Sequence, residues 1–474
     1  MAMSRETAND VDFSLKVYRE ISGNKPKYLT AKNDGDAEAS ELADFVIALN
    51  VIESLSSSAI RAEITIQDSA GLVNHLKGGE FWRMTFKTGN TDATYDLVGY
   101  NISSRSRSGN SEVYIVECVS QDFLFNEVKN VFGSSKQLFQ KKAKAKDVVT
   151  KLLKDKEYLK TSANLHIEDS ENTHEFMVPN WRIFDTIHWI AQKSIRPGTA
   201  SSPQNGFLFW RSSLGYHFKS IDKMIDEANQ QTFEQVTDPK SGKARLYRYT
   251  YEPKKSDDEG NDDFRIDNIT FPEDKNYLLA LRNGSFAGYS TAFDINVFSN
   301  SSINPNTFSP IVYTFDKKGI DKSGKNPKVI DFWNKMSHIG GKVNPAIRFP
   351  DFVKQLVSRP KRIRFGALPN RIFDEKKGKD KQQYSDLAYM QAYQHIRKTT
   401  LQNIQLLVKI PGNLDLYPGY GIDIVIPMTK PSEDQIVKDR QYSGKYIIAA
   451  VRHIYDTNSL VTECLLYRDA LTKE

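Results

Sequence analysis

The stretch that decides the fold lies near the carboxyl end, where residues 421–426 read GIDIVI, residues 443–456 read SGKYIIAAVRHIYD and residues 460–469 read LVTECLLYRD. These runs are rich in β-branched and aromatic residues, and turn-forming residues separate them. A fourth run, LQNIQLLVKI at 401–410, precedes them. We therefore predict four antiparallel strands that form a small β-barrel.

The same kind of pattern occurs in the first quarter of the chain, where apolar runs are separated by clusters of Gly, Asn and Ser. This spacing predicts a compact antiparallel barrel or sandwich. The runs are FVIALNVI at 45–52, AEITI at 62–66, FWRMTF at 81–86, YDLVGYNI at 95–102 and VYIVECV at 113–119.

The two blocks match in their internal order, because a glycine-containing turn precedes a strand in each and a paired hairpin follows. Gly99 precedes Cys118 by 19 residues and Gly444 precedes Cys464 by 20, and Asp122 and Asp469 close the two units. We interpret the match as a duplication; the alternative is chance similarity, because short β-patterns are common. The matching parts are Gly78 and Gly79 before 81–86, Pro418 and Gly419 before 422–426, and the hairpins 97–103 with 113–119 and 445–451 with 460–466.

Between the blocks the pattern changes to mixed helix and strand. Residues 145–159 and a stretch after Asn180 have helical periodicity, and GFLFWRSSLGYHFKSID at 206–222 predicts a hairpin. The predicted fold class is α+β, mainly β, with two related antiparallel β-barrel domains that flank an α+β middle domain. The predicted domains are an N-terminal arm with little core (1–40), a first barrel (41–128), the middle domain (129–262), a second barrel (263–316 with 390–474) and a peripheral insertion (317–389).

Composition limits the classes of function. The chain has 474 residues and a net charge of +6 from 65 basic and 59 acidic residues, a balance too even to indicate a nucleic-acid binder. With Cys118 and Cys464 as its two cysteines, neither a disulfide framework nor a cysteine metal site is expected. The sequence shows neither the apolar core of a signal peptide nor a membrane span, so we expect a soluble protein made in the cytoplasm.

One segment has the spacing of a phosphate-binding loop. Residues 319–326 read GIDKSGKN and follow an apparent strand, but Asn326 stands where that motif needs a magnesium-binding Ser or Thr, and Pro327 follows it. We interpret this lysine-rich segment as a solvated loop.

The densest set of potential metal ligands lacks a recognised ligand spacing, so we interpret it as a polar surface hairpin. His453 lies between apolar residues and is expected to be a structural hydrogen-bonding group, and both cysteines fall within apolar strands. We predict no catalytic residue, no cofactor-binding residue, no metal ligand and no enzyme activity. The potential ligands considered are His166, Glu168, Asp169, His174 and His188.

Two basic clusters and one aromatic hairpin are candidates for contacts with other molecules. KKAKAK at 141–146 and RPKRIR at 359–364 can contact phosphates, but the first suits an exposed helix face and the second can pair with an acidic neighbouring subunit. In the hairpin, alternation separates Phe207 and Phe209 from Leu208 and Trp210, so at least one large aromatic is expected to face another subunit. The hairpin's aromatic residues are Phe207, Phe209, Trp210, Tyr216 and Phe218.

The motifs in their order resemble the central hub proteins of contractile phage baseplates, and they are similar to the hub portion of type VI secretion spike proteins. The resemblance covers about residues 44–471 and includes NGSFAGYSTAFD at 283–294. It implies a homotrimeric virion component, assembled in the host cytoplasm, whose two barrels per subunit form a pseudo-sixfold ring around a lumen for DNA. The implied partners are a trimeric spike, the tail tube or tube-initiator proteins, and the tape measure protein and baseplate wedge, without sequence-specific nucleic-acid binding.

Two other classes of function compete with this hypothesis. One is a tail-associated receptor- or carbohydrate-binding protein or an envelope hydrolase, which exposed aromatic clefts or close carboxylates would favour. The other is an oligonucleotide-binding β-barrel, which salt-dependent binding to single strands would favour. Neither explains a duplicated barrel.

Overall fold

The structure is a computed structural model of the 474-residue chain. It describes residues 8–22, 25–28, 41–132, 143–174, 178–199, 203–251, 263–272, 277–293, 311–314, 329–359, 362–367, 384–428 and 438–472.

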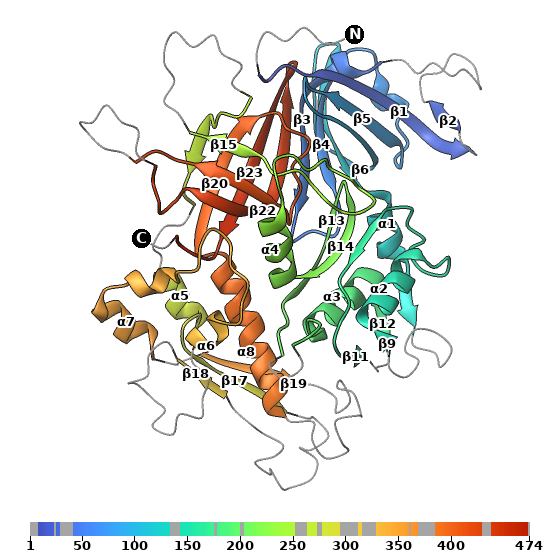
Figure 1. Ribbon diagram of the computed structural model, residues 1–474. Helices are drawn as coiled ribbons and strands as arrows, with labels where there is room; N and C mark the ends of the chain where they lie inside the picture. The colour runs from blue at the N-terminus through green and yellow to red at the C-terminus, as the bar shows by residue number, and fades with distance from the viewer. Residues whose placement is uncertain are drawn as a thin grey trace.

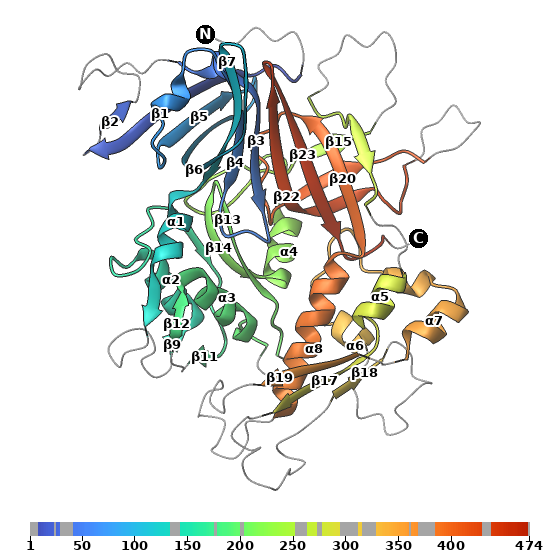
Figure 2. The same ribbon diagram turned by 180° about the vertical axis from the view of Figure 1, so that it is seen from behind.

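A single large sheet forms the upper part of the molecule in Figures 1 and 2 and contains thirteen of the described strands. The first half-sheet consists of β1 (Asp12–Ser22), β2 (Lys25–Tyr28), β3 (Val46–Ser54), β4 (Arg61–Asp68), β5 (Phe81–Lys87), β6 (Asp92–Ser108) and β7 (Ser111–Val119), with 3₁₀ turns at Ala43–Phe45 and Leu72–Asn74. The second half-sheet consists of β15 (Arg248–Thr250), β16 (Asn268–Thr270), β20 (Ile404–Pro411), β21 (Gly421–Val425), β22 (Gly444–Asp456) and β23 (Ser459–Arg468).

The two half-sheets share one strand topology. In the first, β4, β7, β6 and β5 are neighbours in that order, and in the second the order is β20, β23, β22 and β21. In each unit the last strand along the chain (β7 or β23) therefore lies between the first (β4 or β20) and the third (β6 or β22). The third strand also pairs with the second (β5 or β21). This shared order supports the duplication that the sequence predicts.

The residue correspondence within the repeat differs from the one that the spacing predicts. Cys118 on β7 pairs with Gly99, but Cys464 on β23 pairs with Val451, while Gly444 pairs with Ile424 on β21. The register shifts twice between β6 and β7 and once between β22 and β23. The hairpin turns also lie at different places, because β6 ends with Ser108 opposite Ser111 and β22 ends with Asp456 opposite Ser459. Turn position and bulges together set the register, so equal spacing along the chain does not give equal places in the sheet.

The prediction of an α+β chain that is mainly β is confirmed. The thirteen described strands of the two half-sheets form one continuous sheet, and no closed barrel is found among the described residues. The reason lies in β22, whose thirteen residues pair with β21 at one end and with β3 at the other.

The expectation that residues 1–40 contribute little core is wrong for β1. Phe13, Leu15 and Val17 are buried and belong to the same apolar cluster as Met84 and Phe86 of β5. The segment DFSLKVY alternates in the period of two that a half-buried strand requires. The polar residues between the apolar ones concealed this pattern.

The middle unit lies below the first half-sheet. The predicted helices after residues 145 and 180 and the predicted hairpin at 206–222 are confirmed, and Leu152, Ile187 and Phe209 meet in one core. The unit consists of α1 (Gln121–Val128), β8 (Asn130–Phe132), β9 (Ala143–Lys144), α2 (Ala145–Lys154), β10 (Leu165–Ile167), β11 (Thr173–His174), β12 (Pro179–Arg182), α3 (Ile183–Lys193), β13 (Phe207–Ser212), β14 (Gly215–Ser220) and α4 (Ile221–Gln230).

The peripheral unit lies beside the middle unit, below the second half-sheet (Figures 1 and 2). Within the range 263–316, β16 joins the large sheet, whereas β17 pairs with both β18 and β19 in a separate sheet. The predicted domain bounds remain predictions. The unit consists of α5 (Tyr277–Asn283), β17 (Gly288–Phe293), β18 (Ile311–Tyr313), α6 (Val329–Trp333), a 3₁₀ turn (Pro345–Arg348), α7 (Asp351–Val357), β19 (Arg362–Ala367) and α8 (Tyr384–Leu401).

Among the described residues, none of the helices combines the length and the apolar character needed to cross a membrane.

Candidate functional site

The two half-sheets meet at a seam, which we define as the antiparallel pairing of β3 with β22 from Ala48 opposite Asp456 to Ser54 opposite Ala450. One buried carboxylate lies on this seam. Glu53 pairs with Val451 and is 1% exposed, and its Oε2 accepts a hydrogen bond from the Ser213 amide at 3.0 Å. Ser213 belongs to the turn of the β13–β14 hairpin, so Glu53 ties both half-sheets to the middle unit.

Glu53 is incompletely satisfied. Its Oε1 has no hydrogen-bond partner among the described residues, and neither does the hydroxyl of the buried Tyr95. Burial raises the pKa of Glu53 from 4.5 to about 7, against the opposing effects of the Ser213 hydrogen bonds and the charge of Arg211. The carboxyl group therefore titrates near neutral pH.

A second buried site, which we call the polar joint, connects α4, α8, the segment 336–339 and the residue that follows β23. At its centre the Arg397 guanidinium lies between two carboxylates: its Nε is 3.1 Å from Asp222 Oδ1 and its Nη1 is 3.1 Å from Asp469 Oδ2. All three side chains are 0% exposed. Arg397 Nη2 also donates to the Ser337 carbonyl at 2.8 Å.

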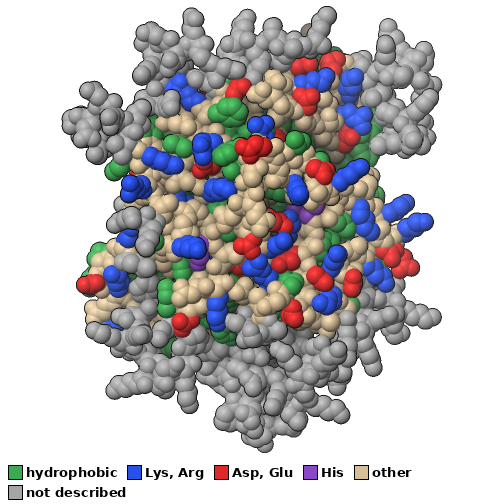
Figure 3. All heavy atoms as spheres, in the orientation of Figure 1, with side chains coloured by type: hydrophobic (Ala, Val, Ile, Leu, Met, Phe, Trp, Pro, Cys, Tyr) green, Lys and Arg blue, Asp and Glu red, His purple; other side chains and the backbone are tan. Residues whose placement is uncertain are grey.

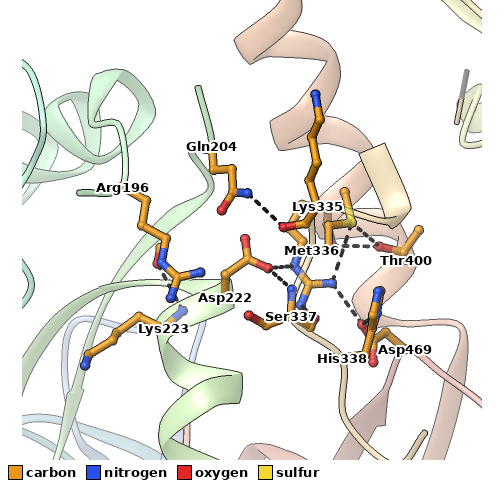
Figure 4. Close-up of polar contacts among 12 residues, drawn as sticks. Arg196, Gln204, Asp222, Lys223, Lys335, Met336, Ser337, His338, Thr400 and Asp469 are labelled. Carbon is orange, nitrogen blue, oxygen red and sulfur yellow. Dashed lines mark hydrogen bonds and ion pairs between the residues drawn. The ribbon is translucent and has the colours of Figure 1, made fainter. Parts of the chain in front are cut away.

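Both carboxylates of the polar joint are fully engaged. Asp222 accepts from the Ser337 amide at 2.8 Å and from the Tyr393 hydroxyl at 2.8 Å. Asp469 accepts from the Ile339 amide at 2.9 Å and lies 2.9 Å from His338 Nδ1. Figure 4 shows Asp222 and Asp469 on opposite sides of this network, with Ser337 and His338 between the elements that carry them.

Electrostatics explains how these charges remain buried. Burial opposes the ionisation of Asp469, but the His338 hydrogen bond and the positive charge of Arg397 hold the pKa of Asp469 below its usual value. His338 Nε2 also lies 2.9 Å from the Trp333 carbonyl. Both ring nitrogens of His338 thus lie within hydrogen-bond distance of an oxygen atom, so the ring is held between Asp469 and the Trp333 carbonyl.

The two aspartates that were predicted to close the repeat units have different roles. Asp469 follows β23 and holds the peripheral unit through the polar joint. Asp122 follows β7 and accepts hydrogen bonds from Thr161 at 2.6 Å and Tyr216 at 3.2 Å in the middle unit. Asp469 therefore joins the end of the second half-sheet to the peripheral unit, whereas Asp122, on α1, holds together the part of the middle unit that directly follows β7.

The aromatic hairpin does not face outward. Each of its five aromatic residues is at most 2% exposed, so the expectation of an aromatic face for another subunit is wrong. Trp210 is covered within the chain, because its Nε1 donates to the Pro418 carbonyl at 3.0 Å and its ring stacks on His217. A Cβ on Gly419, whose φ is +89°, would lie 2.5 Å from this ring, so the Pro418–Gly419 turn needs glycine for this contact.

The potential metal ligands do not converge. Among the described residues, no group of three or more His, Cys, Asp or Glu side chains could hold a metal ion. Each histidine of the set faces a hydroxyl or a carbonyl: His166 Nε2 lies 3.3 Å from Leu214 O, His174 Nε2 3.3 Å from Ser194 Oγ and His188 Nε2 3.1 Å from Ser58 Oγ.

The two carboxylates of that set serve local structure. Glu168 accepts a hydrogen bond from the Ser220 amide at 2.6 Å, and Asp169 accepts from the Ser170 amide at 2.8 Å. Elsewhere, His453 is buried and lies 3.0 Å from Thr462 Oγ1, as expected for a structural hydrogen-bonding group. Burial lowers the pKa of His453 to about 4, so this ring is neutral at physiological pH.

Both cysteines are buried and unpaired with each other, on β7 and β23. Burial raises the pKa of each thiol far above its usual value. The phosphate-loop-like segment 319–326 lies outside the described residues.

Three described residues of the basic clusters, Lys144, Arg362 and Arg364, have structural contacts. Lys144 donates to the Ser170 carbonyl at 3.1 Å. Arg362 Nε and Arg364 Nη2 donate to the carbonyls of Arg282 and Asn283 at 2.6 and 2.7 Å. On the face shown in Figure 3, the described basic side chains are interspersed with acidic ones.

No protein-family model matches the chain, and no curated protein matches it. Several solved structures are similar to it. A tail protein from Neisseria meningitidis has 9% identity and a TM-score of 0.46, with 97% of each chain covered. The 43 kDa tail protein of prophage MuSo2 from Shewanella oneidensis has 7% identity and a TM-score of 0.46, with 98% of this chain and 99% of that chain covered.

A third similar structure is a component of the E. coli type VI secretion system. It has 10% identity and a TM-score of 0.39, with 89% of this chain and 73% of that chain covered. Of these three similar structures, two are phage tail proteins and one is a type VI secretion component.

Sequence reasoning missed the polar joint and Glu53. A signal for Glu53 was present: in β3 it continues the inward alternation of Leu49 and Val51, so a carboxylate stands at a core position. No comparable signal marked Asp222 and Arg397, which lie on different helices far apart in the sequence.

Proposed function

We propose that the chain is a structural connector in a contractile phage tail baseplate: the central hub, a homotrimer that joins the tail tube to the cell-puncturing spike. The observation that carries this proposal is the repeated strand order of the two half-sheets and their union at the seam. The proposal includes a lumen for DNA passage and a place in the virion baseplate. It includes no catalytic step.

The repeat within the chain matters for the symmetry of the proposed assembly. A homotrimer with two similar half-sheets per chain presents six similar units, which suits a junction between a sixfold tube and a threefold spike. The six units become the barrel-like walls of one ring. The continuous sheet holds the two units of one chain at a fixed relative position, as a rigid adaptor requires.

The ends of the large sheet support assembly with other chains. Within the described residues, β2 pairs with β1 and β16 pairs with β20, so each presents an open edge. Open edges offer unpaired backbone groups to a neighbouring strand. A permanent trimer of this kind is expected to bury about 2,000–5,000 Å² per interface.

The proposed partners are the trimeric spike on one side of the ring and the tail tube or tube-initiator proteins on the other. The tape measure protein and the baseplate wedge complete the set. Burial of the aromatic hairpin leaves the competing carbohydrate-binding function without the aromatic face that the sequence suggested for it.

Light scattering of the purified chain over a range of concentrations tests the proposal. The expected mass is three times the 54.0 kDa of one chain, and it should persist on dilution because a large apolar interface dissociates slowly. A mass of one chain at all concentrations contradicts the proposal.

A further inference from the structure

A groove lies between the peripheral unit and the lower end of the second half-sheet, on the side of α5 and α7 in Figure 1. Its volume is about 420 Å³. This is within the range of roughly 300–1,000 Å³ that is usual for binding sites. The apolar part of its lining comes from both bodies: Leu279, Phe286, Phe349, Val353, Ile404 and Leu471.

Apolar side chains are also exposed on the helices that form the groove. Leu279 on α5 lines it and is 41% exposed, its neighbour Leu278 is 51% exposed, and Phe352 on α7 is 68% exposed. Large apolar side chains clustered on two adjacent short helices are typical of a surface that another protein covers.

The polar lining of the groove indicates which kind of molecule covers it. Asn283, Gln402, Gln405 and Gln441 supply amides along the lining. An amide side chain both donates and accepts hydrogen bonds, as a peptide backbone requires. A peptide segment can use both parts of this lining, because its side chains contact the apolar residues and its backbone bonds to the amides.

The charged residues around the groove indicate the sign of the charge that its occupant carries. Arg348 is the charged member of the groove lining. On α5 and α7, Arg282 and Lys354 are basic and Asp351 is acidic, and Lys354 pairs with Asp351 at 3.6 Å. The excess of positive charge complements a partner with carboxylates beside its apolar residues.

We propose that this groove docks a segment of a partner protein that inserts apolar side chains between α5 and α7 and places a carboxylate near Arg348. The inference goes beyond the proposed ring, because the groove lies outside the pairing edges of the large sheet. A segment docked there is held by a pocket and one charge contact, so we expect micromolar affinity for an isolated peptide.

Fluorescence anisotropy with the full-length chain tests this inference. The probe is a labelled twelve-residue peptide of Leu, Phe and Glu, and its matched control carries Lys in place of every Glu. We expect the Glu peptide to bind at least tenfold more tightly than the Lys peptide. Leu279→Arg should weaken binding of the Glu peptide at least tenfold, whereas Val236→Arg, at an 81% exposed site outside the groove lining, should not change it.

A charge reversal supplies the second test. Arg348→Glu should remove the preference for the Glu peptide. The melting temperature of this variant should match that of the wild type, which shows that the chain is folded. Failure of the Glu peptide to bind, equal binding of both peptides or an unchanged affinity in Leu279→Arg overturns the inference. The light-scattering mass of Leu279→Arg separates the two proposals, because loss of peptide binding with an unchanged oligomeric mass concerns the groove alone.

Discussion

Arg397 connects parts of the chain that are far apart in sequence. It bridges Asp222 at the start of α4 and Asp469 after β23, with no exposure of any of the three side chains. Removing these charges from water is costly, and their mutual attraction offsets that cost only while the network is complete. The polar joint therefore fixes how the middle unit, the peripheral unit and the second half-sheet meet.

Replacing Arg397 with Met should destabilise the protein strongly. The variant leaves two carboxylates buried without their cation, which costs about 3–5 kcal/mol in comparable buried pairs. The matched control is Arg452→Met, which removes a half-exposed arginine that pairs with Glu463 at 3.6 Å. That change should cost less than about 1 kcal/mol. Thermal unfolding of both variants measures the difference, and equal losses would show that the polar joint has no special role.

Glu53→Gln should make stability less dependent on pH. Because the pKa of Glu53 rises from 4.5 to about 7 on folding, the folded state binds its proton more tightly than the unfolded state does. The wild type thus loses stability as pH rises from 4.5 through 7, by about 3 kcal/mol in total. The Gln side chain does not titrate, so the variant should not lose this part of its stability as pH rises.

Melting temperatures at several values between pH 5 and pH 8 test this prediction. The melting temperature of the Gln variant should rise relative to that of the wild type as pH increases toward 7. All other titrating groups are common to both proteins, so they do not contribute to this difference. Parallel curves would mean that Glu53 is ionised throughout the range.

At the scale of the elements, β1 shows how a strand can be overlooked. Its apolar residues alternate with Asp12, Ser14 and Lys16, so its average composition is polar although its inward face is fully apolar. The strand pairs with β5 from Asp12 opposite Lys87 to Tyr18 opposite Phe81 and completes the core of the first half-sheet.

Leu15→Ala tests the contribution of β1 to the core. Leu15 is 0% exposed, and removing its side chain should cost about 2–5 kcal/mol. Asp12→Ala, on the exposed side of the same strand, should change stability by less than about 0.5 kcal/mol. If Leu15→Ala melts like the wild type, β1 is not part of the folded core.

Most of the repeated sheet could be predicted from the sequence, because its strands are long, strongly apolar and bounded by turn residues. Three features could not be predicted. The register of the hairpins depends on bulges, the seam depends on β22 being long enough for two neighbours, and Trp210 finds its cover in the distant Pro418–Gly419 turn. All three follow from contacts between segments that are far apart in the chain.

For the candidate sites, too, local features could be predicted from the sequence and contacts between distant segments could not. Local patterns identified the histidines, cysteines and basic runs: the histidines and several of the basic residues have structural contacts, and the cysteines are buried. The polar joint depends on four separate segments that meet only in the folded chain, so no local spacing indicated it. Buried charge networks of this kind belong to tertiary structure, not to motifs.

At the scale of the whole molecule, the central feature is the pair of similar half-sheets held in one continuous sheet. A duplicated unit in a trimer gives six similar positions from three chains. In the proposed trimer, the middle unit follows the first half-sheet of each chain and Asp469 joins the peripheral unit to the second, so the six sheet units would be alike while the attached units would alternate.

The most direct test of this account is an electron cryomicroscopy reconstruction of the purified assembly without imposed symmetry. The account predicts a ring of three chains whose wall shows six similar sheet units, with the middle and peripheral units alternating around it in threefold symmetry. Isolated monomers, or a ring in which the two half-sheets of a chain occupy different layers, would contradict it.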